Sequence, residues 1–400
     1  MRTGNTIYMD YQASTPIDPL VKSSLIQALD DFGNPHSSEH AIGWKAADAL
    51  NSAQERVARA LHVDHDEVVF TSGATESNNF AVVGACSGAP KDRRTILLPQ
   101  TEHKCTLESV RAVRSLGFEI EYLEVHQDGS IDLDYLSSAL SERVALVSVM
   151  AVHNEIGTTQ PMPEIVRLAH EKDALVHSDA VQLLSVPGFH SLAADVDILS
   201  FSAHKIYGPK GIGFSIVRRE AQRRMKPLLH GGGQQSNLRS GTVPMPLSVA
   251  CAEAVELMTG QDAQLEREKI SELQRRLWDR LRTSRYPVRL NGPDLAVRHP
   301  GNLNLAFPDF KSHEIISMLQ PHLAISSGSA CSSGTLEPSH VLQALGLPRS
   351  VSEASIRIGF GRFTTHSEVE LAADLLIETL DRLRALGTMD RQDEAKPIKG

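Results

Sequence analysis

Short apolar segments rich in β-branched residues alternate with longer helical patterns as far as residue 260, and this alternation restricts the fold more than any other feature. The pattern predicts strands at 67–71, 95–99, 145–149, 174–178, 197–200 and 213–217, with helices at 44–61, 104–116, 132–140 and 162–171. Several strand segments are continuously apolar, which is typical of a parallel sheet that is buried on both faces. We therefore predict an α/β domain in which helices cover both faces of a mostly parallel central sheet.

The pattern changes beyond residue 260. It predicts a long charged helix at 262–283, strands at 302–306 and 355–359, and helices at 312–319, 339–344 and 367–386. These elements indicate a second, smaller α+β domain. The polar C-terminal segment 387–400 is expected to be a disordered tail.

The charge and the cysteine content exclude several classes of protein. Lys and Arg number 40 against 49 Asp and Glu, and this net charge of −9 argues against direct binding of nucleic acid. The four cysteines form no C-x-x-C pair, which argues against a disulfide framework or a cysteine-rich zinc site. The sequence contains neither a secretory apolar core at its N-terminus nor an apolar run long enough to span a membrane. We expect a soluble protein without a metal, in the reducing cytoplasm.

Chemically active side chains follow three of the predicted strands, where open α/β sheets bind their ligands. Lys205, in AHKIYGPKG, either forms a Schiff base with an aldehyde or lies on a surface turn, and its own segment leaves both interpretations open. Asp179 either holds the pyridinium nitrogen of pyridoxal phosphate or caps a helix. The segment 71–77, TSGATES, either binds an anion through backbone N–H groups or is an ordinary helix cap. The three features together are harder to explain by structure alone than any one of them.

One cysteine lies among residues that cannot enclose it. Cys331 is part of ISSGSACSSG (325–334), where Ser, Gly and Ala form no apolar pocket for a thiol. We expect a flexible loop at about 325–336 that carries a nucleophilic thiol. Cys86, Cys105 and Cys251 lie in helical or apolar surroundings and are expected to be structural.

Eight sequence blocks carry a family resemblance over nearly the whole chain: SGATESNN (72–79), TEHK (101–104), NEIGT (154–158), HSDAVQ (177–182), AHKIYGPKG (203–211), GGGQQ (231–235), LRSGT (238–242) and SSGSACSSGTLEPSHVL (326–342). In this order they resemble the cysteine desulfurases of the NifS/IscS type, which have the class V aminotransferase fold, fold type I of the enzymes that depend on pyridoxal 5'-phosphate (PLP). The resemblance implies a large PLP-binding domain at 16–260. It also implies a small domain, formed by 1–15 and 261–386, that carries the Cys331 loop.

The resemblance implies a role for each residue that would hold PLP. Lys205 would bind its aldehyde covalently, Asp179 would pair with the pyridine nitrogen, and Gln182 would bind the 3-oxygen. His103 would lie over the ring. The remaining cofactor residues would be Asn154 and the groups that bind the phosphate, which are Ala74 through its backbone, Thr75, Ser202, His204 and, from the neighbouring subunit, Thr242. The active form is therefore expected to be a homodimer.

The resemblance also implies the reaction. Asn154 and Arg357 would bind the carboxylate of the substrate L-cysteine, Lys205 would remove its Cα proton, and His103 would serve in proton transfer. The Cys331 thiolate would attack the substrate sulfur, leaving a persulfide and L-alanine. The sulfur would then pass to an acceptor protein for iron–sulfur cluster assembly, tRNA thiolation or DNA phosphorothioate modification.

Three positions depart from the family pattern. Gln12 stands where relatives carry a histidine, His153 where Asn is more usual, and Ala203 where Gly is frequent. No role is implied for these residues. Two alternatives to the desulfurase stay open: a selenocysteine lyase or other enzyme of this fold, and a catalytically silent scaffold for sulfur transfer. The sequence does not identify the sulfur acceptor.

Overall fold

The chain forms two compact units in a computed structural model that describes residues 2–3, 6–327 and 339–394. The large unit comprises Ser14–His153 and Thr158–Leu265, and the small unit comprises Met1–Ala13, Asn154–Gly157 and Glu266–Gly400. The segment Asn154–Gly157 belongs to the small unit although both its sequence neighbours belong to the large one. No pattern in the sequence indicated this. Cys331 and most of its loop lie outside the described residues.

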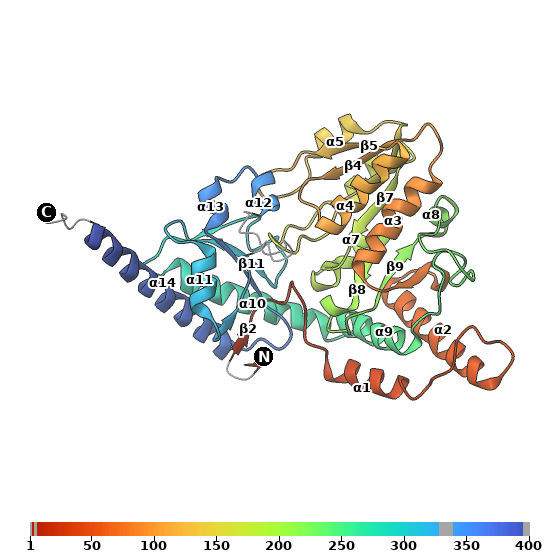
Figure 1. The fold of residues 1–400 in the computed structure, drawn as a ribbon, viewed down its shortest axis with the longest axis horizontal. Helices are drawn as coiled ribbons and strands as arrows, with labels where there is room; N and C mark the ends of the chain where they lie inside the picture. The colour runs from red at the N-terminus through yellow and green to blue at the C-terminus, as the bar shows by residue number, and fades with distance from the viewer. Residues whose placement is uncertain (1, 4–5, 328–338, 395–400) are drawn as a thin grey trace. The chain divides into compact units, whose positions relative to one another are not determined.

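A seven-stranded sheet forms the centre of the large unit (Figure 1). Its order is β3 (Val68–Thr71), β9 (Gly213–Val217), β8 (Ile198–Ser202), β7 (Leu175–Asp179), β6 (Val144–Ser148), β4 (Thr95–Pro99) and β5 (Glu119–Leu123). Only β9 runs antiparallel to its neighbours in this sheet. Every residue of β6, β7 and β8 is buried, because their apolar segments contact helices on both faces. The predicted α/β fold with a mostly parallel sheet is confirmed.

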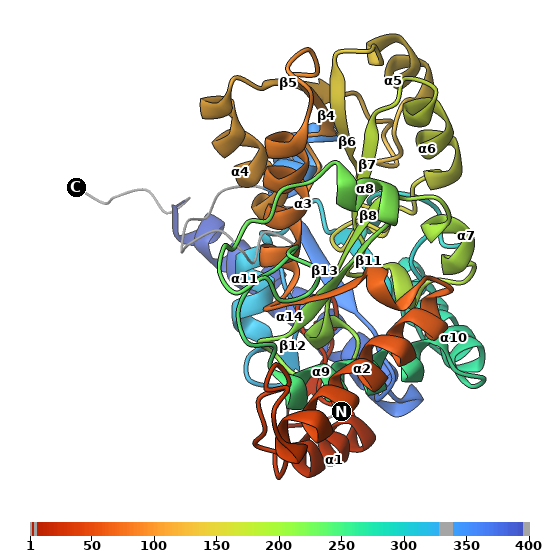
Figure 2. The ribbon, with the colours of Figure 1, turned by 90° about the vertical axis from the view of Figure 1, so that its right-hand side faces the viewer.

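Helices cover both faces of this sheet (Figure 2). On one face lie α3 (Ala74–Gly88) and α4 (Lys104–Ala112), and on the other lie α5 (Leu133–Ala139), α6 (Met162–His170) and α7 (Phe189–Ala193). Phe80 and Val82 of α3 are buried in one apolar cluster with Leu98 of β4. The other α-helices of this unit are α1 (Pro19–Ala28), α2 (Ala41–Leu61), α8 (Arg219–Arg223) and α9 (Met245–Thr259). Of these, α1 and α2 both pack against α9.

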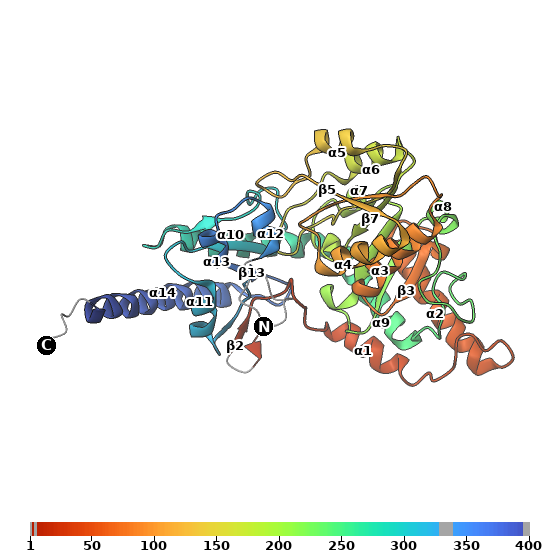
Figure 3. The same ribbon diagram turned by 45° about the horizontal axis from the view of Figure 1, so that its top comes forward.

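The small unit contains two three-stranded sheets (Figure 3). One is antiparallel, in the order β10 (Arg289–Leu290), β11 (Asn302–Ala306) and β13 (Ser355–Gly359), and the other consists of β1 (Arg2–Thr3), β2 (Thr6–Tyr8) and β12 (Leu323–Ala324). The helices are α10 (Ala263–Arg282), α11 (Ser312–Leu319), α12 (His340–Ala344), α13 (Arg349–Glu353) and α14 (His366–Glu394). The helix α11 packs against α14. Because α14 continues to Glu394, part of the segment expected to be a disordered tail is helical.

No helix among the described residues is both long enough and apolar enough to cross a membrane.

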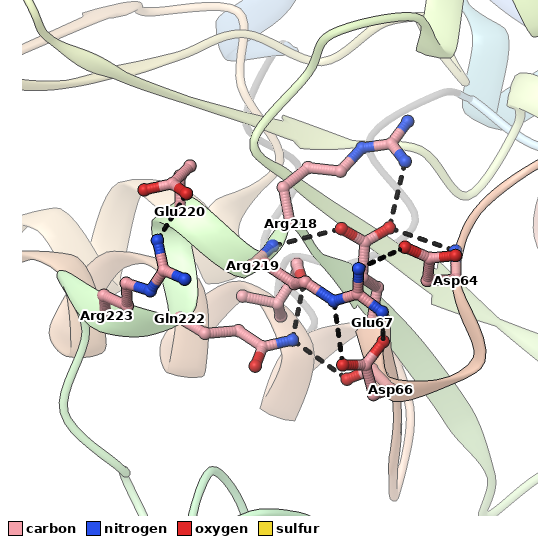
Figure 4. Close-up of polar contacts among 9 residues, drawn as sticks. Asp64, Asp66, Glu67, Arg218, Arg219, Glu220, Gln222 and Arg223 are labelled. Carbon is pink, nitrogen blue, oxygen red and sulfur yellow. Dashed lines mark hydrogen bonds and ion pairs between the residues drawn. The ribbon is translucent and has the colours of Figure 1, made fainter.

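A cluster of acidic and basic side chains ties the segment before β3 to the segment after β9 (Figure 4). The buried carboxylate of Glu67 accepts hydrogen bonds from Arg218 Nη1 at 3.1 Å and from the backbone N–H of Arg219 at 3.0 Å. The guanidinium of Arg219 contacts Asp66 at 2.9 Å and Asp64 at 2.7 Å. Since β3 and β9 are antiparallel neighbours, these contacts fasten the edge of the sheet that carries β3.

Replacing Glu67 with Ala leaves the Arg218 guanidinium and the Arg219 N–H without their acceptor. We expect this change to lower the free energy of unfolding by about 2 kcal/mol. The matched control is Glu220→Ala, which removes an exposed ion pair with Arg223 and should change stability by less than about 0.5 kcal/mol. The measurement is chemical denaturation followed by circular dichroism. Equal midpoints for both variants would contradict the interpretation.

Candidate active site

The parallel strands of the large unit end at one edge of the sheet, and most of the predicted site residues follow these ends. Asp179 is the last residue of β7 and Ser202 the last residue of β8. Lys205 ends a short 3-10 helix, Ala203–Lys205, directly after β8. His103 follows β4 and is the N-cap of α4. The order of the strands in the sheet therefore brings together residues that are far apart in the sequence.

Asp179 is a buried carboxylate with defined hydrogen-bond donors. It is 3% exposed. Its Oδ2 accepts from Asn78 Nδ2 at 2.7 Å, and its Oδ1 accepts from the backbone N–H of Val181 at 3.2 Å. These donors offset part of the cost of removing the carboxylate from water. No role was predicted for Asn78, although it lies within the SGATESNN block.

His103 and Cys105 contact each other beside Asp179. Nδ1 of His103 lies 2.9 Å from Sγ of Cys105, which also accepts from Asn78 Nδ2 at 3.1 Å. The ligand atoms of His103, Cys105 and Asp179 all lie within 4.8 Å of one another. Cys105 lies in a helix, as expected, but its thiol contacts polar groups from α3 and from the residue before α4.

Glu102 is a second carboxyl group at this edge that was not singled out from the sequence. It is 1% exposed and accepts a hydrogen bond from the backbone N–H of Met150 at 2.6 Å. Burial, and to a lesser extent the negative charge of Asp179, raises the pKa of Glu102 to about 8. Glu102 therefore holds a proton at neutral pH.

The N-terminus of α3 adjoins the end of β8. Gly73, the N-cap, has a φ of 146°, and no side chain caps the helix. A Cβ at Gly73 would lie 3.5 Å from Ser202 Oγ, so the backbone and the hydroxyl group are close. The first N–H groups of an uncapped helix are donors for an anion. Ala74 and Thr75, both predicted to bind phosphate, are the first two residues of α3.

His204 is uncharged at neutral pH. Burial, assisted by the nearby Lys205 and Lys210, lowers the pKa of His204 to about 4. Its Nδ1 lies 3.2 Å from Ser14 Oγ. His204 can therefore offer a hydrogen bond to an anion but not a full positive charge.

The backbone around Lys205 is held by Thr15. The Thr15 N–H and hydroxyl donate to the His204 carbonyl at 2.8 and 3.0 Å, and the Tyr207 N–H donates to Thr15 Oγ1 at 2.7 Å. Tyr207 has a φ of 67°, so the chain turns sharply after Lys205. The half-buried lysine is therefore presented from a fixed backbone.

Gln182 and Thr242 occupy different environments. Gln182 is buried three residues after the end of β7. Thr242 is exposed in this single chain. Its loop is tied to α3 by an ion pair in which Arg239 Nε lies 2.7 Å from Glu76 Oε1. Although burial raises the pKa of Glu76, the hydrogen bonds from Arg239 and Ser72 outweigh it and lower this pKa.

Arg357 and Asn154 meet within the small unit. Arg357, on β13, is 2% exposed; its Nη2 donates to Asp10 Oδ1 at 2.9 Å and its Nη1 to the Asn154 carbonyl at 3.4 Å. The Nε atom of Arg357 is buried and has no hydrogen-bond partner among the described residues. The pairing with Asp10 was not anticipated, because the two residues lie 347 positions apart.

The three departures from the family pattern lie in packed positions. Gln12 is buried and its Nε2 donates to the Gly301 carbonyl at 2.7 Å. The ring Nε2 of His153 lies 2.8 Å from the Thr101 carbonyl. Ala203 is buried directly after β8. These contacts support the backbone, and none of them involves Asp179 or His103.

The family model described as Aminotransferase class-V matches residues 7–371, nearly the whole chain. The chain belongs to the class-V aminotransferase family.

Curated relatives in the family are similar over most of their length. The mitochondrial cysteine desulfurase of Drosophila melanogaster is 42% identical over 387 residues, which is 96% of this chain and 83% of the relative. Cysteine desulfurase IscS of Rickettsia felis is 42% identical over 389 residues, which is 96% of this chain and 93% of the relative.

Solved structures agree with this family fold. A NifS-like protein superposes with a TM-score of 0.86 at 32% identity, covering 94% of this chain and 99% of its own. A structure described as SspA in complex with cysteine gives a TM-score of 0.76 at 32% identity, with 90% and 100% covered. DndA from Streptomyces lividans gives 0.74 at 32% identity, with 87% and 98% covered.

Cysteine desulfurases of the class-V aminotransferase family depend on PLP, and the large unit fits this cofactor. The fit rests on an uncapped helix N-terminus, a buried carboxylate and a lysine after a buried strand, all at the same sheet edge. The buried Oδ1 of Asn78 also has no hydrogen-bond partner among the described residues. Cys86 and Cys251 are buried, and burial raises the pKa of each thiol to about 12, which is typical of unreactive thiols.

Proposed function

We propose that this chain is a PLP-dependent cysteine desulfurase that converts L-cysteine to L-alanine and carries the released sulfur on Cys331 as a persulfide. The observation that carries the proposal is the buried Asp179 carboxylate at the same sheet edge as Lys205, in a chain whose relatives are cysteine desulfurases. An acid in this position keeps a pyridine nitrogen protonated.

We assign the cofactor contacts as follows. Asp179 would pair with the ring nitrogen, Gln182 would bind the 3-oxygen, and His103 would contact the ring. Asn154 would complete the ring contacts. The phosphate would be held by the α3 N-terminus at Ala74 and Thr75, by the hydroxyl of Ser202 and by the neutral imidazole of His204. Bound PLP supplies an electron sink for the bonds of the substrate Cα.

The protein's own residues then act in turn. Arg357 binds the substrate carboxylate, and the amine of Lys205 takes the Cα proton at Nζ. The thiolate of Cys331 attacks the substrate sulfur, so that an S–S bond forms while the Cβ–S bond breaks and its electron pair stays with the carbon product. His103 takes part in the proton transfers that complete alanine. After the reaction, the enzyme carries the sulfur as a persulfide on Cys331.

The surroundings of Arg357 support its assignment to an anion. Its guanidinium is buried and only partly satisfied, since Asp10 takes one hydrogen bond and Nε has no partner among the described residues. Asp10 fixes the plane of the Arg357 guanidinium group and leaves some of its N–H donors available. A planar carboxylate can therefore be bound in one orientation.

The sulfur acceptor is proposed to be a protein in the cytoplasm. The net charge of −9 disfavours direct delivery to nucleic acid, and a free Cys331 thiol needs a reducing compartment. Iron–sulfur cluster assembly, tRNA thiolation and DNA phosphorothioate modification are all served by this chemistry. The structural similarity to DndA keeps the last of these among the candidates.

The active form is proposed to be a homodimer. Large apolar side chains are exposed along α1, the segment that follows it and the start of α2: Leu20, Ile26, Leu29, Phe32, Ile42 and Trp44, each at least 51% exposed. Phe32 is the most exposed of these, at 84%. A Cβ at the adjacent Gly33 would lie 2.4 Å from the Ile42 carbonyl, so the two ends of this surface adjoin. An apolar surface of this kind on the large unit is suited to a second copy of the chain.

Charges placed on this apolar surface should weaken the dimer. We expect the double variant Phe32→Asp/Trp44→Asp to raise the dimer dissociation constant by at least about 30-fold, because buried aromatic side chains dominate interfaces. The control Leu265→Asp changes an apolar side chain that is 66% exposed elsewhere and should leave the dimer intact. Sedimentation velocity over a concentration series measures both. A monomeric wild type, or unchanged dissociation in the double variant, would contradict the proposal.

The catalytic assignment is tested with three variants. Lys205→Ala should lose the visible absorption of the covalently bound cofactor, whereas Lys210→Ala, at an exposed position five residues away, should keep it. Cys331→Ser should keep the absorption but produce no sulfide from L-cysteine under reducing conditions, because a hydroxyl group cannot accept the sulfur. Absorption spectra report the bound cofactor, and assays of alanine and sulfide measure the reaction in each variant. Sulfide formation by Cys331→Ser would favour another enzyme of this fold, and a colourless wild type would favour the silent scaffold.

A further inference from the structure

Cys105 is a thiol beside the cofactor site that the reaction described above does not use. It is the second residue of α4 and is half-buried. Its Sγ lies 2.9 Å from Nδ1 of His103 and 3.1 Å from Nδ2 of Asn78. The thiol therefore sits between an imidazole expected to transfer protons and an amide bound to Asp179.

The hydrogen bonds around the imidazole determine where its proton lies. Nδ1 of His103 accepts from the backbone N–H of Cys105 at 3.2 Å. A backbone N–H can only donate, so Nδ1 presents a lone pair and the neutral ring carries its proton on Nε2. The thiol must then be the donor in its contact with Nδ1, since that nitrogen has no proton to give.

The side-chain amide of Asn78 supports the same direction for these hydrogen bonds. One N–H of Nδ2 donates to Asp179 Oδ2 at 2.7 Å and the other donates to Cys105 Sγ. The reversed amide would place Oδ1 against the Asp179 carboxylate, and two oxygen acceptors would then face each other. The sulfur thus accepts from Asn78 while its own S–H donates to His103.

A cation bound by His103, Cys105 and Asp179 is a weaker explanation of the same cluster. Their ligand atoms are close enough for a metal ion. However, an N–H group already points at each ligand atom, from the Cys105 backbone at Nδ1 and from Asn78 at Sγ and Oδ2. A cation there would face three donors, so the hydrogen-bond network accounts for the arrangement better.

We propose that Cys105 is a positioning residue: its S–H holds the His103 imidazole in the Nε2–H tautomer and couples its orientation, through Asn78, to Asp179. The proton of the neutral ring then lies on the nitrogen remote from the start of α4. A ring free to change tautomer or to rotate would present this proton for only part of the time. The catalytic consequence rests on the proposed role of His103, but the tautomer itself does not.

The test uses the full-length chain labelled with ¹⁵N-histidine, with PLP and without it. The chemical shifts of Nδ1 and Nε2 distinguish the two neutral tautomers, and the His103→Asn spectrum identifies the His103 signals among the 17 histidines. Wild type and Cys105→Ser, which keeps an X–H donor, should both show the Nε2–H form. Cys105→Ala should raise the fraction of the Nδ1–H form by about fivefold, the loss of one neutral hydrogen bond.

The kinetic arm of the same experiment separates this inference from the proposed function. Turnover of L-cysteine should fall in Cys105→Ala, recover in Cys105→Ser, and show an unchanged KM in both. Wild-type ¹⁵N shifts in Cys105→Ala would overturn the positioning role, whatever the activity. If Cys105→Ala shows altered shifts but the wild type releases no sulfide from L-cysteine, the tautomer assignment is upheld and the desulfurase assignment is rejected.

Discussion

The buried charge of Asp179 is the constraint around which the large unit is arranged. A carboxylate that is 3% exposed needs donors, and it finds them in Asn78 from α3 and in the backbone of Val181. The strand that carries it, β7, lies between β6 and β8 in the sheet, so the residues that follow the neighbouring strands lie at the same edge. Glu102, also buried, remains protonated, which avoids a second charge beside it.

Several residues of the proposed site are held in place by hydrogen bonds and ion pairs within their own unit. Thr15 fixes the backbone on both sides of Lys205, and an ion pair between Arg239 and Glu76 ties the loop of Thr242 to α3. In the small unit, Asp10 fixes the guanidinium of Arg357 in one plane. Such preorganisation is how a protein orients a cofactor whose intrinsic chemistry would otherwise follow several routes.

The sequence predicted the continuously apolar strands and missed elements that show neither a continuous apolar run nor an amphipathic period. The strand at 95–99 has the predicted bounds because it is continuously apolar, whereas β5, read as EIEYL at the sheet edge, alternates with charged residues and was overlooked. The helix α9 was missed because it is buried on nearly all sides and shows no amphipathic period. The Asp10–Arg357 pair and the partners of Cys105 depend on contacts that only the folded chain brings together. Family motifs identified Asp179 and Lys205 but gave no role to Asn78 or Glu102, which lie inside two other motifs of the family, SGATESNN and TEHK.

The protonation state of the cofactor's ring nitrogen tests the central role of Asp179 most directly. It can be measured by ¹⁵N NMR of the holoenzyme reconstituted with PLP labelled at the ring nitrogen. We expect a protonated nitrogen throughout the neutral pH range in the wild type and in Asp197→Asn, which changes a buried control carboxylate next to the start of β8. We expect that proton to be lost in Asp179→Asn. A ring nitrogen that is unprotonated in the wild type, or that stays protonated in Asp179→Asn, would contradict the account.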